Sequence, residues 1–291
     1  YFSLKIIYIN VLKKPFKLNA KRVEPNRLKT TNIKYAIRKN STLHRLNFFG
    51  ATKIFINVKN IITIAKKPIA SEFINVEDKK VNKIIVPSNF VKKDLKRLGI
   101  NQEKITVVHN GINHSLFYPR EVFTAESEMI KPFAIRRPYF LYASKMSSPL
   151  KRHVELIKAF EIFKKKTNLP HRLVLAGSEG ECAESVKKAA LISPYASDIF
   201  ITGYFPHESF PALYAGSEGC LFPSEIEGVG LPILEAMATG IPVVCSKSGA
   251  LQEIAGEKAI LFDSTNLEEI AESIEKIAVD TKLRKKMIKD G

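Results

Sequence analysis

From residue 139 onward, short uninterrupted apolar runs alternate with segments of helical periodicity, and this alternation constrains the fold more than any other feature. The runs lack the alternating polar residues of a half-exposed strand, so they predict a parallel sheet with helices on both faces. The predicted strands are 139–143, 172–177, 198–205, 219–224, 242–246 and 259–263, and the predicted helices are 152–165, 207–216, 232–239, 251–255 and 267–279. This order predicts an α/β domain of the Rossmann-like type, in which ligands bind at the carboxyl ends of the strands.

The part before residue 120 is less regular, but it also predicts an α/β arrangement. Strands are predicted at 5–9, 53–58, 83–88 and 104–112, whereas 13–50 gives no clear assignment. A helix is predicted between Ser88 and Gly99, because serine suits the N-cap and glycine suits the position just past a helix end. A chain of 291 residues is long enough for two domains. We therefore predict a partial or divergent N-terminal domain at 1–120, a linker at 121–138 and a C-terminal domain at 139–291.

The net charge of +17 is distributed unevenly along the chain. Residues 1–120 carry a net charge of +19, whereas residues 121–291 carry −2. One interpretation is a surface that meets anions, such as an acidic membrane. The other is a composition rich in lysine whose side chains point into solvent in all directions. The sequence leaves both interpretations open.

Several classes of protein are disfavoured by the composition. The chain contains no apolar run of the roughly 18 residues that a membrane-spanning helix needs. Its first residues also lack the cleavage site of a signal peptide. The three cysteines, Cys182, Cys220 and Cys245, are too widely spaced for a disulfide framework or a zinc site. We therefore expect a cytoplasmic protein that can work at the cytoplasmic face of a membrane.

Residues 225–243, "EIEGVGLPILEAMATGIPV", read as a glycine loop that leads from a strand directly into a helix. Pro232 suits the first helical turn and Gly240 suits the position just past the helix end. The free amides around residues 228–231 would point out of the helix N-terminus, where the helix dipole favours an anion. A ligand that bears phosphate is therefore expected at this loop.

Charged residues flank the predicted phosphate site. Glu235, placed in the first helical turn, can accept two hydrogen bonds from a vicinal diol such as that of a ribose. Glu227 precedes the glycines and would face whatever extends beyond the phosphates. Lys145 and Lys151 lie in the loop after strand 139–143, at the same predicted edge of the sheet, and two cations there can neutralise a diphosphate. Together these residues predict a site for a nucleoside diphosphate joined to a polar group.

Five segments, in this order, resemble glycosyltransferase family 4, also called glycosyl transferases group 1, whose members have the GT-B fold of two Rossmann-like domains. They are "KIIVPSNFVKKDLKRLGINQEKITVVHNGINHSLFYP", "FLYASKMSSPLKRHVELIKAFE", "RLVLAGSEG", "ITGYFPHESFPALYAGSEGCLFPSEIEGVGLPILEAMATGIPVV" and "GALQEIAGEKAILFD". The resemblance extends from about residue 83 to residue 290. A single pair of glutamates seven residues apart would be weak evidence, but five motifs in the family order are specific.

The resemblance implies an activity and a role for each site residue. The family transfers a hexose from a nucleotide-sugar, with retention of anomeric configuration, to a saccharide or lipid-linked acceptor, and needs no metal or other cofactor. By this resemblance Glu227 is the catalytic residue, which contacts the hexose near its anomeric carbon, and Glu235 binds the donor ribose. The remaining donor-binding residues would be Lys145, Lys151, Gly228, Val229, Gly230 and Leu231. A nucleic-acid partner is not expected, because no nucleic-acid-binding motif is visible.

The sequence also departs from the family pattern. Lys145 stands where the family usually has arginine, and Val229 stands where it usually has phenylalanine. The glycine-rich loop and the active-site histidine of the family's N-terminal domain have no convincing match. A truncated chain would explain this, and so would a catalytically inactive homologue that binds a nucleotide or a partner. His153 and His207, at predicted helix starts, are expected to be surface residues.

Overall fold

The computed structural model describes residues 44–48, 51–55, 61–63, 82–120, 129–130 and 135–291. The strand predicted at 5–9 and nearly all of the unassigned segment 13–50 lie outside the described residues. The strand predicted at 53–58 corresponds in part to β2.

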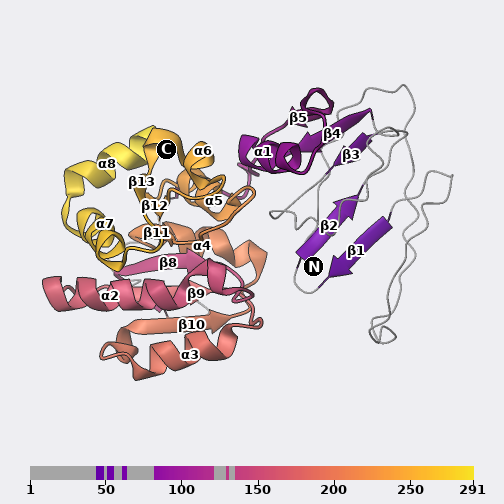
Figure 1. Cartoon of the computed structure of the whole chain (residues 1–291). Coiled ribbons are helices and arrows are strands. Elements are labelled where there is room, and N and C mark those ends of the chain that lie inside the picture. Colours follow the sequence, from indigo (N-terminus) through magenta and orange to yellow (C-terminus); the bar gives the residue numbers. More distant parts are fainter. Residues whose placement is uncertain (1–43, 49–50, 56–60, 64–81, 121–128, 131–134) are drawn as a thin grey trace. The chain divides into compact units, whose positions relative to one another are not determined.

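The main sheet has six parallel strands, as the uninterrupted apolar runs predict (Figure 1). They are β8 Tyr139–Ala143, β9 Arg172–Ala176, β10 Ile199–Gly203, β11 Gly219–Phe222, β12 Val243–Ser246 and β13 Ile260–Phe262. Their order across the sheet is β10-β9-β8-β11-β12-β13. All five neighbouring pairs run parallel, so the carboxyl ends of the strands share one edge.

Seven α-helices accompany these strands in the described residues from 135 onward. They are α2 His153–Thr167, α3 Ala183–Ile192, α4 Phe210–Ala215, α5 Leu231–Ala238, α6 Leu251–Ala255, α7 Leu267–Val279 and α8 Thr281–Asp290. Helix α2 packs against α3 and α7, and α5 packs against α4 and α6. The sequence did not predict α3 and α8. Their buried faces are small, since α3 buries two alanines and one valine and α8 buries Met287 alone.

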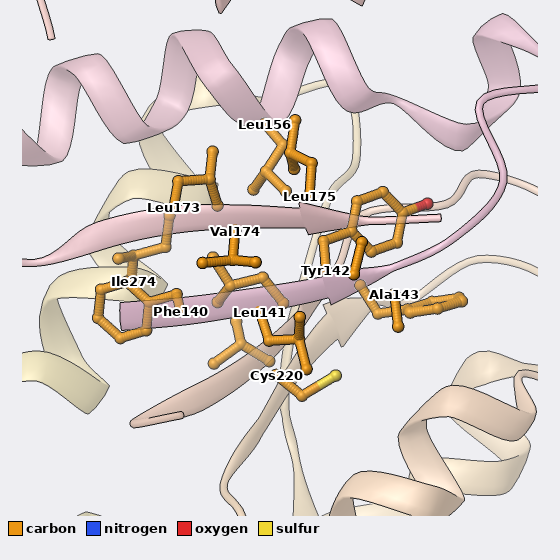
Figure 2. Close-up of a cluster of buried hydrophobic side chains, with 14 of the residues drawn as sticks. Phe140, Leu141, Tyr142, Ala143, Leu156, Leu173, Val174, Leu175, Cys220 and Ile274 are labelled. Carbon is orange, nitrogen blue, oxygen red and sulfur yellow. The ribbon is translucent and has the colours of Figure 1, made fainter. Parts of the chain in front are cut away.

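The core of this sheet is built around β8, in which all five residues are buried (Figure 2). Figure 2 shows Leu156 of α2 lying over β9, the strand that carries Leu173 and Leu175. Each fully buried large apolar side chain of this kind contributes about 1.5–3 kcal/mol through removal from water. Cys220 and Cys245 are buried in β11 and β12. They therefore pack as small apolar residues, as expected, and burial raises the pKa of the Cys245 thiol to about 12.

The described residues before 120 form a second, smaller parallel sheet of β3 Ile61–Thr63, β4 Lys83–Val86 and β5 Ile105–Val107. Helix α1 Asn89–Arg97 begins as predicted, because the Ser88 hydroxyl oxygen accepts a hydrogen bond from the Val91 amide at 3.3 Å. It ends before Gly99, whose φ of +87° only glycine adopts without strain. Ile84, Val91, Leu95 and Ile105 are among the residues of a separate hydrophobic cluster.

Two antiparallel strand pairs complete the described elements. They are β1 His44–Phe48 with β2 Ala51–Phe55, and β6 Met129–Ile130 with β7 Ile135–Arg136. The small parallel sheet agrees with an α/β arrangement in the first part of the chain. The exact domain boundaries at 120 and 138 stay a prediction.

Within the described residues, no helix has both the length and the apolarity needed to cross a bilayer.

Candidate functional site

The six-stranded sheet has one topological switch point, between β8 and β11. From β8 the chain continues outward to β9 and β10, then returns to place β11 on the other side of β8. The loops that follow β8 and β11 therefore leave the same edge of the sheet side by side. In open α/β sheets this is where ligands bind. The predicted site residues Lys145, Lys151 and Glu227 all lie in these two loops.

The loop after β8 places its two lysines in different environments. It ends in a short 3₁₀ turn, Pro149–Lys151, which is fixed to the sheet because the buried Tyr142 hydroxyl donates to the Lys151 carbonyl oxygen at 2.9 Å. The Lys151 ammonium forms an ion pair with Glu227, and both side chains are largely buried. Lys145 is exposed, and no hydrogen bond or ion pair joins its ammonium group to another described residue. One cation is thus held inside the site and one is available at its rim.

Glu227 is held from several directions. The Ser224 hydroxyl donates to the same carboxylate oxygen that meets Lys151, at 2.9 Å. The Glu227 carbonyl oxygen accepts a hydrogen bond from the Ala250 amide at 3.0 Å. A side chain at Gly249 would lie 2.9 Å from backbone atoms of Glu227, so only glycine permits this approach. The sequence had predicted a role for Glu227, but it indicated neither the contact with Lys151 nor the contribution of Ser224.

The glycine loop opens α5 as the sequence predicts. Gly230 is the N-cap residue with φ of +77°, and no side chain caps the helix there. Helix α5 starts at Leu231, with Pro232 in its first turn, and Gly240 follows its end with φ of +77°. Gly228 and Val229 are buried in the loop before it. The uncapped start of α5 agrees with the expectation of free amides at this loop.

The predicted position of Glu235 within its helix was wrong by one residue. Because α5 begins at Leu231, one residue before its predicted start, Glu235 is the fifth helical residue and lies beyond the first turn. Its carboxylate accepts a hydrogen bond from the Tyr214 hydroxyl at 3.1 Å. Burial, together with the nearby Glu235 carboxylate, raises the pKa of Tyr214, so Tyr214 stays protonated and continues to donate. The side chain of Glu235 is thereby held at one end while its other oxygen faces His207.

His207 was expected at the surface, and its side chain is 45% exposed. It nevertheless approaches the site, because its Nε2 atom lies 3.9 Å from the Glu235 carboxylate. The residue begins the short 3₁₀ helix His207–Ser209 that precedes α4. Sequence reasoning missed this approach, since it depends on how the loop after β10 folds back towards α5.

His153 was also expected at the surface, and that prediction was wrong: only 3% of the residue is exposed. The reason is its place on α2. His153 lies on the same face of the helix as Leu156, Ile157 and Phe160, so it turns towards the sheet. Its ring packs on Tyr142, with 4.7 Å between ring centroids. Burial, and to a smaller extent the Lys151 charge, lowers the pKa of His153 to about 4, against an opposing hydrogen bond to the Ser144 backbone.

The buried His153 predicts an acid-sensitive fold. The pKa of about 4 in the folded state lies below the value of about 6.5 in the unfolded chain, so folding favours the neutral ring. This contribution is complete above pH 6.5 and is lost as the pH falls towards 4. At pH 4.5 the loss should be on the order of 2 kcal/mol. Urea unfolding at pH 7 and pH 4.5 should show a smaller acid loss for His153→Phe than for the wild type. The exposed His114→Phe is the control, and an equal acid loss in all three proteins would contradict the assignment.

The six-stranded parallel sheet and the second, smaller parallel sheet agree with the two Rossmann-like domains of a GT-B glycosyltransferase. The chain belongs to the family of glycosyl transferases group 1, whose model matches residues 126–291. A second model, Glycosyltransferase Family 4, matches residues 36–116 in the first part of the chain. The resemblance derived from the sequence motifs is confirmed.

Curated relatives match parts of the chain. The chain is 34% identical over 136 residues to O-antigen chain mannosyltransferase B of Escherichia coli, a match that covers 47% of this chain and 35% of the relative. It is 26% identical over 210 residues to sulfoquinovosyl transferase SQD2 of Arabidopsis thaliana, covering 69% of this chain and 38% of the relative. The matches thus cover little more than a third of the length of these relatives.

Solved structures show the same fold. HepE of Anabaena, in complex with UDP and glucose, matches with a TM-score of 0.65 at 20% identity, over 76% of this chain and 61% of that one. Sucrose-phosphate synthase of Thermosynechococcus elongatus matches with a TM-score of 0.63 at 22% identity, over 81% of this chain and 62% of that one. At this level of identity these structures support the fold alone.

Proposed function

We propose that the full-length protein is a retaining glycosyltransferase that moves a hexose from a nucleotide-sugar to a saccharide or lipid-linked acceptor. The observation that carries the proposal is the meeting of Lys151 and Glu227 at the switch point of the sheet, in a chain of this family. The names of the relatives agree with it, since they include mannosyltransferases and a sulfoquinovosyl transferase. One structural neighbour is described in complex with UDP and glucose.

In this proposal each residue has a distinct task. Lys145 and Lys151 neutralise the diphosphate, whose oxygens also receive hydrogen bonds from the amides that open α5. Glu235 accepts the hydroxyl groups of the ribose, and Glu227 contacts the transferred sugar. The site stabilises the departing diphosphate and the positive charge on the sugar by fixed dipoles and charges, which need no rearrangement during the reaction. That the transfer needs no metal or other cofactor stays a prediction.

A second candidate keeps the binding but not the turnover. A catalytically inactive homologue would hold a nucleoside diphosphate through the same lysines and glycine loop without cleaving a nucleotide-sugar. The two candidates differ in one measurement: the rate at which nucleoside diphosphate is released from UDP-glucose or GDP-mannose as the sugar is transferred to water. Release above the rate in buffer supports the enzyme, whereas binding without release supports the inactive homologue.

The role of Glu235 gives a direct test of donor binding. Glu235→Ala removes the acceptor of the ribose hydroxyl groups, so the affinity for UDP or GDP should fall by roughly 1.5–3 kcal/mol, or about 10- to 150-fold. Glu235→Gln keeps an acceptor for the Tyr214 hydroxyl and separates loss of binding from loss of packing. Exposed Glu208→Ala is the control. Titration calorimetry with both nucleotides measures the effect, and unchanged affinity in the alanine variant would remove Glu235 from the site.

We also propose that the basic first part attaches the protein to anionic membranes. The net charge of +19 on residues 1–120 is the supporting observation. Each basic residue close to an acidic bilayer contributes about 1 kcal/mol, and salt screens this attraction. Co-sedimentation with acidic liposomes should therefore exceed that with neutral liposomes and should weaken as salt rises. Equal recovery with both lipids, or recovery that ignores salt, would contradict electrostatic attachment and favour a soluble acceptor.

A further inference from the structure

Arg152 has a backbone conformation that is unusual for its residue type. Among the residues that the structure describes, Arg152 and Asn168 are the two non-glycine residues with positive φ, at 55° and 53°. Asparagine adopts this left-handed conformation comparatively easily, and Asn168 follows the end of α2. Arginine adopts it less easily, so the conformation at the start of α2 must be maintained by the surrounding contacts. These are the backbone hydrogen bonds of Arg152 with Pro149 and Leu156, and the contacts of its side chain.

The Arg152 guanidinium joins two segments that are distant in the sequence. One nitrogen, Nη1, donates to Glu155 in the first turn of α2 at 2.9 Å. The other, Nη2, donates to Glu225, which lies in the loop after β11. The arginine side chain is only 23% exposed, so solvent screens these two contacts less than it would at an open surface.

The same two segments are also joined on either side of this contact. The Glu225 amide donates to the Leu150 carbonyl oxygen at 2.8 Å. The Lys151 ammonium meets the Glu227 carboxylate. Residues 150, 151 and 152 thus each contact residue 225 or 227, so the loop after β8 and the loop after β11 are connected at three consecutive positions.

We infer that Arg152 is a positioning residue, which holds Glu225 so that Lys151 and Glu227 stay together at the switch point. The consequence for donor binding rests on the proposed function, because Lys151 then faces the diphosphate. The pairing of Lys151 with Glu227 then depends on Arg152 as well, although the Arg152 side chain contacts neither residue.

The variant Arg152→Gly distinguishes a positioning role of Arg152 from a role in stability alone. Arg152→Gly removes the guanidinium but accommodates positive φ without strain, so the thermal midpoint should stay the same or rise. The affinity for UDP or GDP should nevertheless fall roughly fivefold or more, as expected when coupled contacts are lost. Asn168→Gly is the matched control, because it also places glycine at a position of positive φ, at the other end of α2, and it should leave the affinity unchanged.

A second readout needs no ligand. The rate at which an amine-acetylating reagent modifies Lys151, measured by mass spectrometry, should rise several-fold in Arg152→Gly, because the ammonium is then held less firmly against Glu227. Arg152→Ala keeps a Cβ atom and its backbone restriction, so it should show the same rise if the guanidinium is the cause. Glu225→Gln should act in the same direction, and adding it to Arg152→Gly should change little further.

The outcomes distinguish the two proposals. If the wild type binds neither nucleotide, the proposed function fails, and Lys151 modification still decides the role of Arg152. If the wild type binds and Arg152→Gly binds equally well, with Lys151 modified at the wild-type rate, the positioning role is overturned and the proposed function stands. A fall in affinity together with faster modification, without loss of stability, supports the positioning role.

Discussion

Replacing Glu227 by glutamine is expected to lower the release of nucleoside diphosphate from a nucleotide-sugar about a hundredfold or more, which corresponds to roughly 2.7 kcal/mol of transition-state stabilisation. In the proposed function Glu227 lies against the sugar whose positive charge grows as the diphosphate departs. A neutral amide keeps the shape and the acceptor for the Ser224 hydroxyl, but it loses the charge. The loss should therefore appear in turnover and not in folding.

The same substitution should have a different effect on nucleotide affinity. In Glu227→Gln the amide oxygen still accepts a hydrogen bond from the Lys151 ammonium, so the lysine stays at the switch point. UDP or GDP should therefore bind about as tightly as to the wild type. Slower turnover with unchanged binding is not what a misfolded site would give. The exposed Glu257→Gln should change neither quantity. Unchanged turnover in Glu227→Gln would remove this residue from the reacting centre.

The elements of the sheet were largely predictable from the sequence, because each strand of a buried parallel sheet is an uninterrupted apolar run. All six predicted strands are present, and the helix after Gly230 begins within one residue of its predicted start. Helices α3 and α8 were missed because they bury few large side chains, so their periodicity is weak. The order of the strands was not predictable either, since it depends on which strands pair and not on the pattern within each strand.

The candidate site was also predictable only in part. Glycines and charged residues in the loops after β8 and β11 could be assigned from their spacing to strands and helices. The ion pair of Lys151 with Glu227 joins residues 76 positions apart and follows from the strand order, which places the two loops together. Ser224 gave no signal, because a serine after a strand is common. The sequence signal of His153 was misleading. A polar residue at a helix start resembles a surface residue unless the face of the helix on which it lies is considered.

Replacing Gly177 by alanine is expected to give the largest loss of stability. Gly177 follows β9 directly, and a Cβ atom there would lie 2.1 Å from the Ser144 carbonyl oxygen and 2.5 Å from its carbonyl carbon. Both atoms belong to the backbone, so no side-chain rotation relieves the overlap. Hydrogen bonds also connect the ends of these strands. The Ser144 amide donates to the Ala176 carbonyl oxygen at 2.9 Å, and the Gly177 amide donates to the Gly203 carbonyl oxygen at 3.0 Å. Separating them breaks hydrogen bonds at the end of three neighbouring strands.

The expected cost of Gly177→Ala is about 3 kcal/mol or more, which corresponds to a fall of roughly 6–12 °C in the thermal midpoint. Because Ser144 begins the loop that carries Lys145, nucleotide affinity should fall as well. Gly111→Ala is the matched control: no atom lies within 4 Å of its added methyl group, so its midpoint should stay the same or rise slightly. Circular dichroism melts of the three proteins make the comparison. If Gly177→Ala melts within about one degree of the wild type, the close backbone approach between the ends of β8 and β9 does not exist in solution.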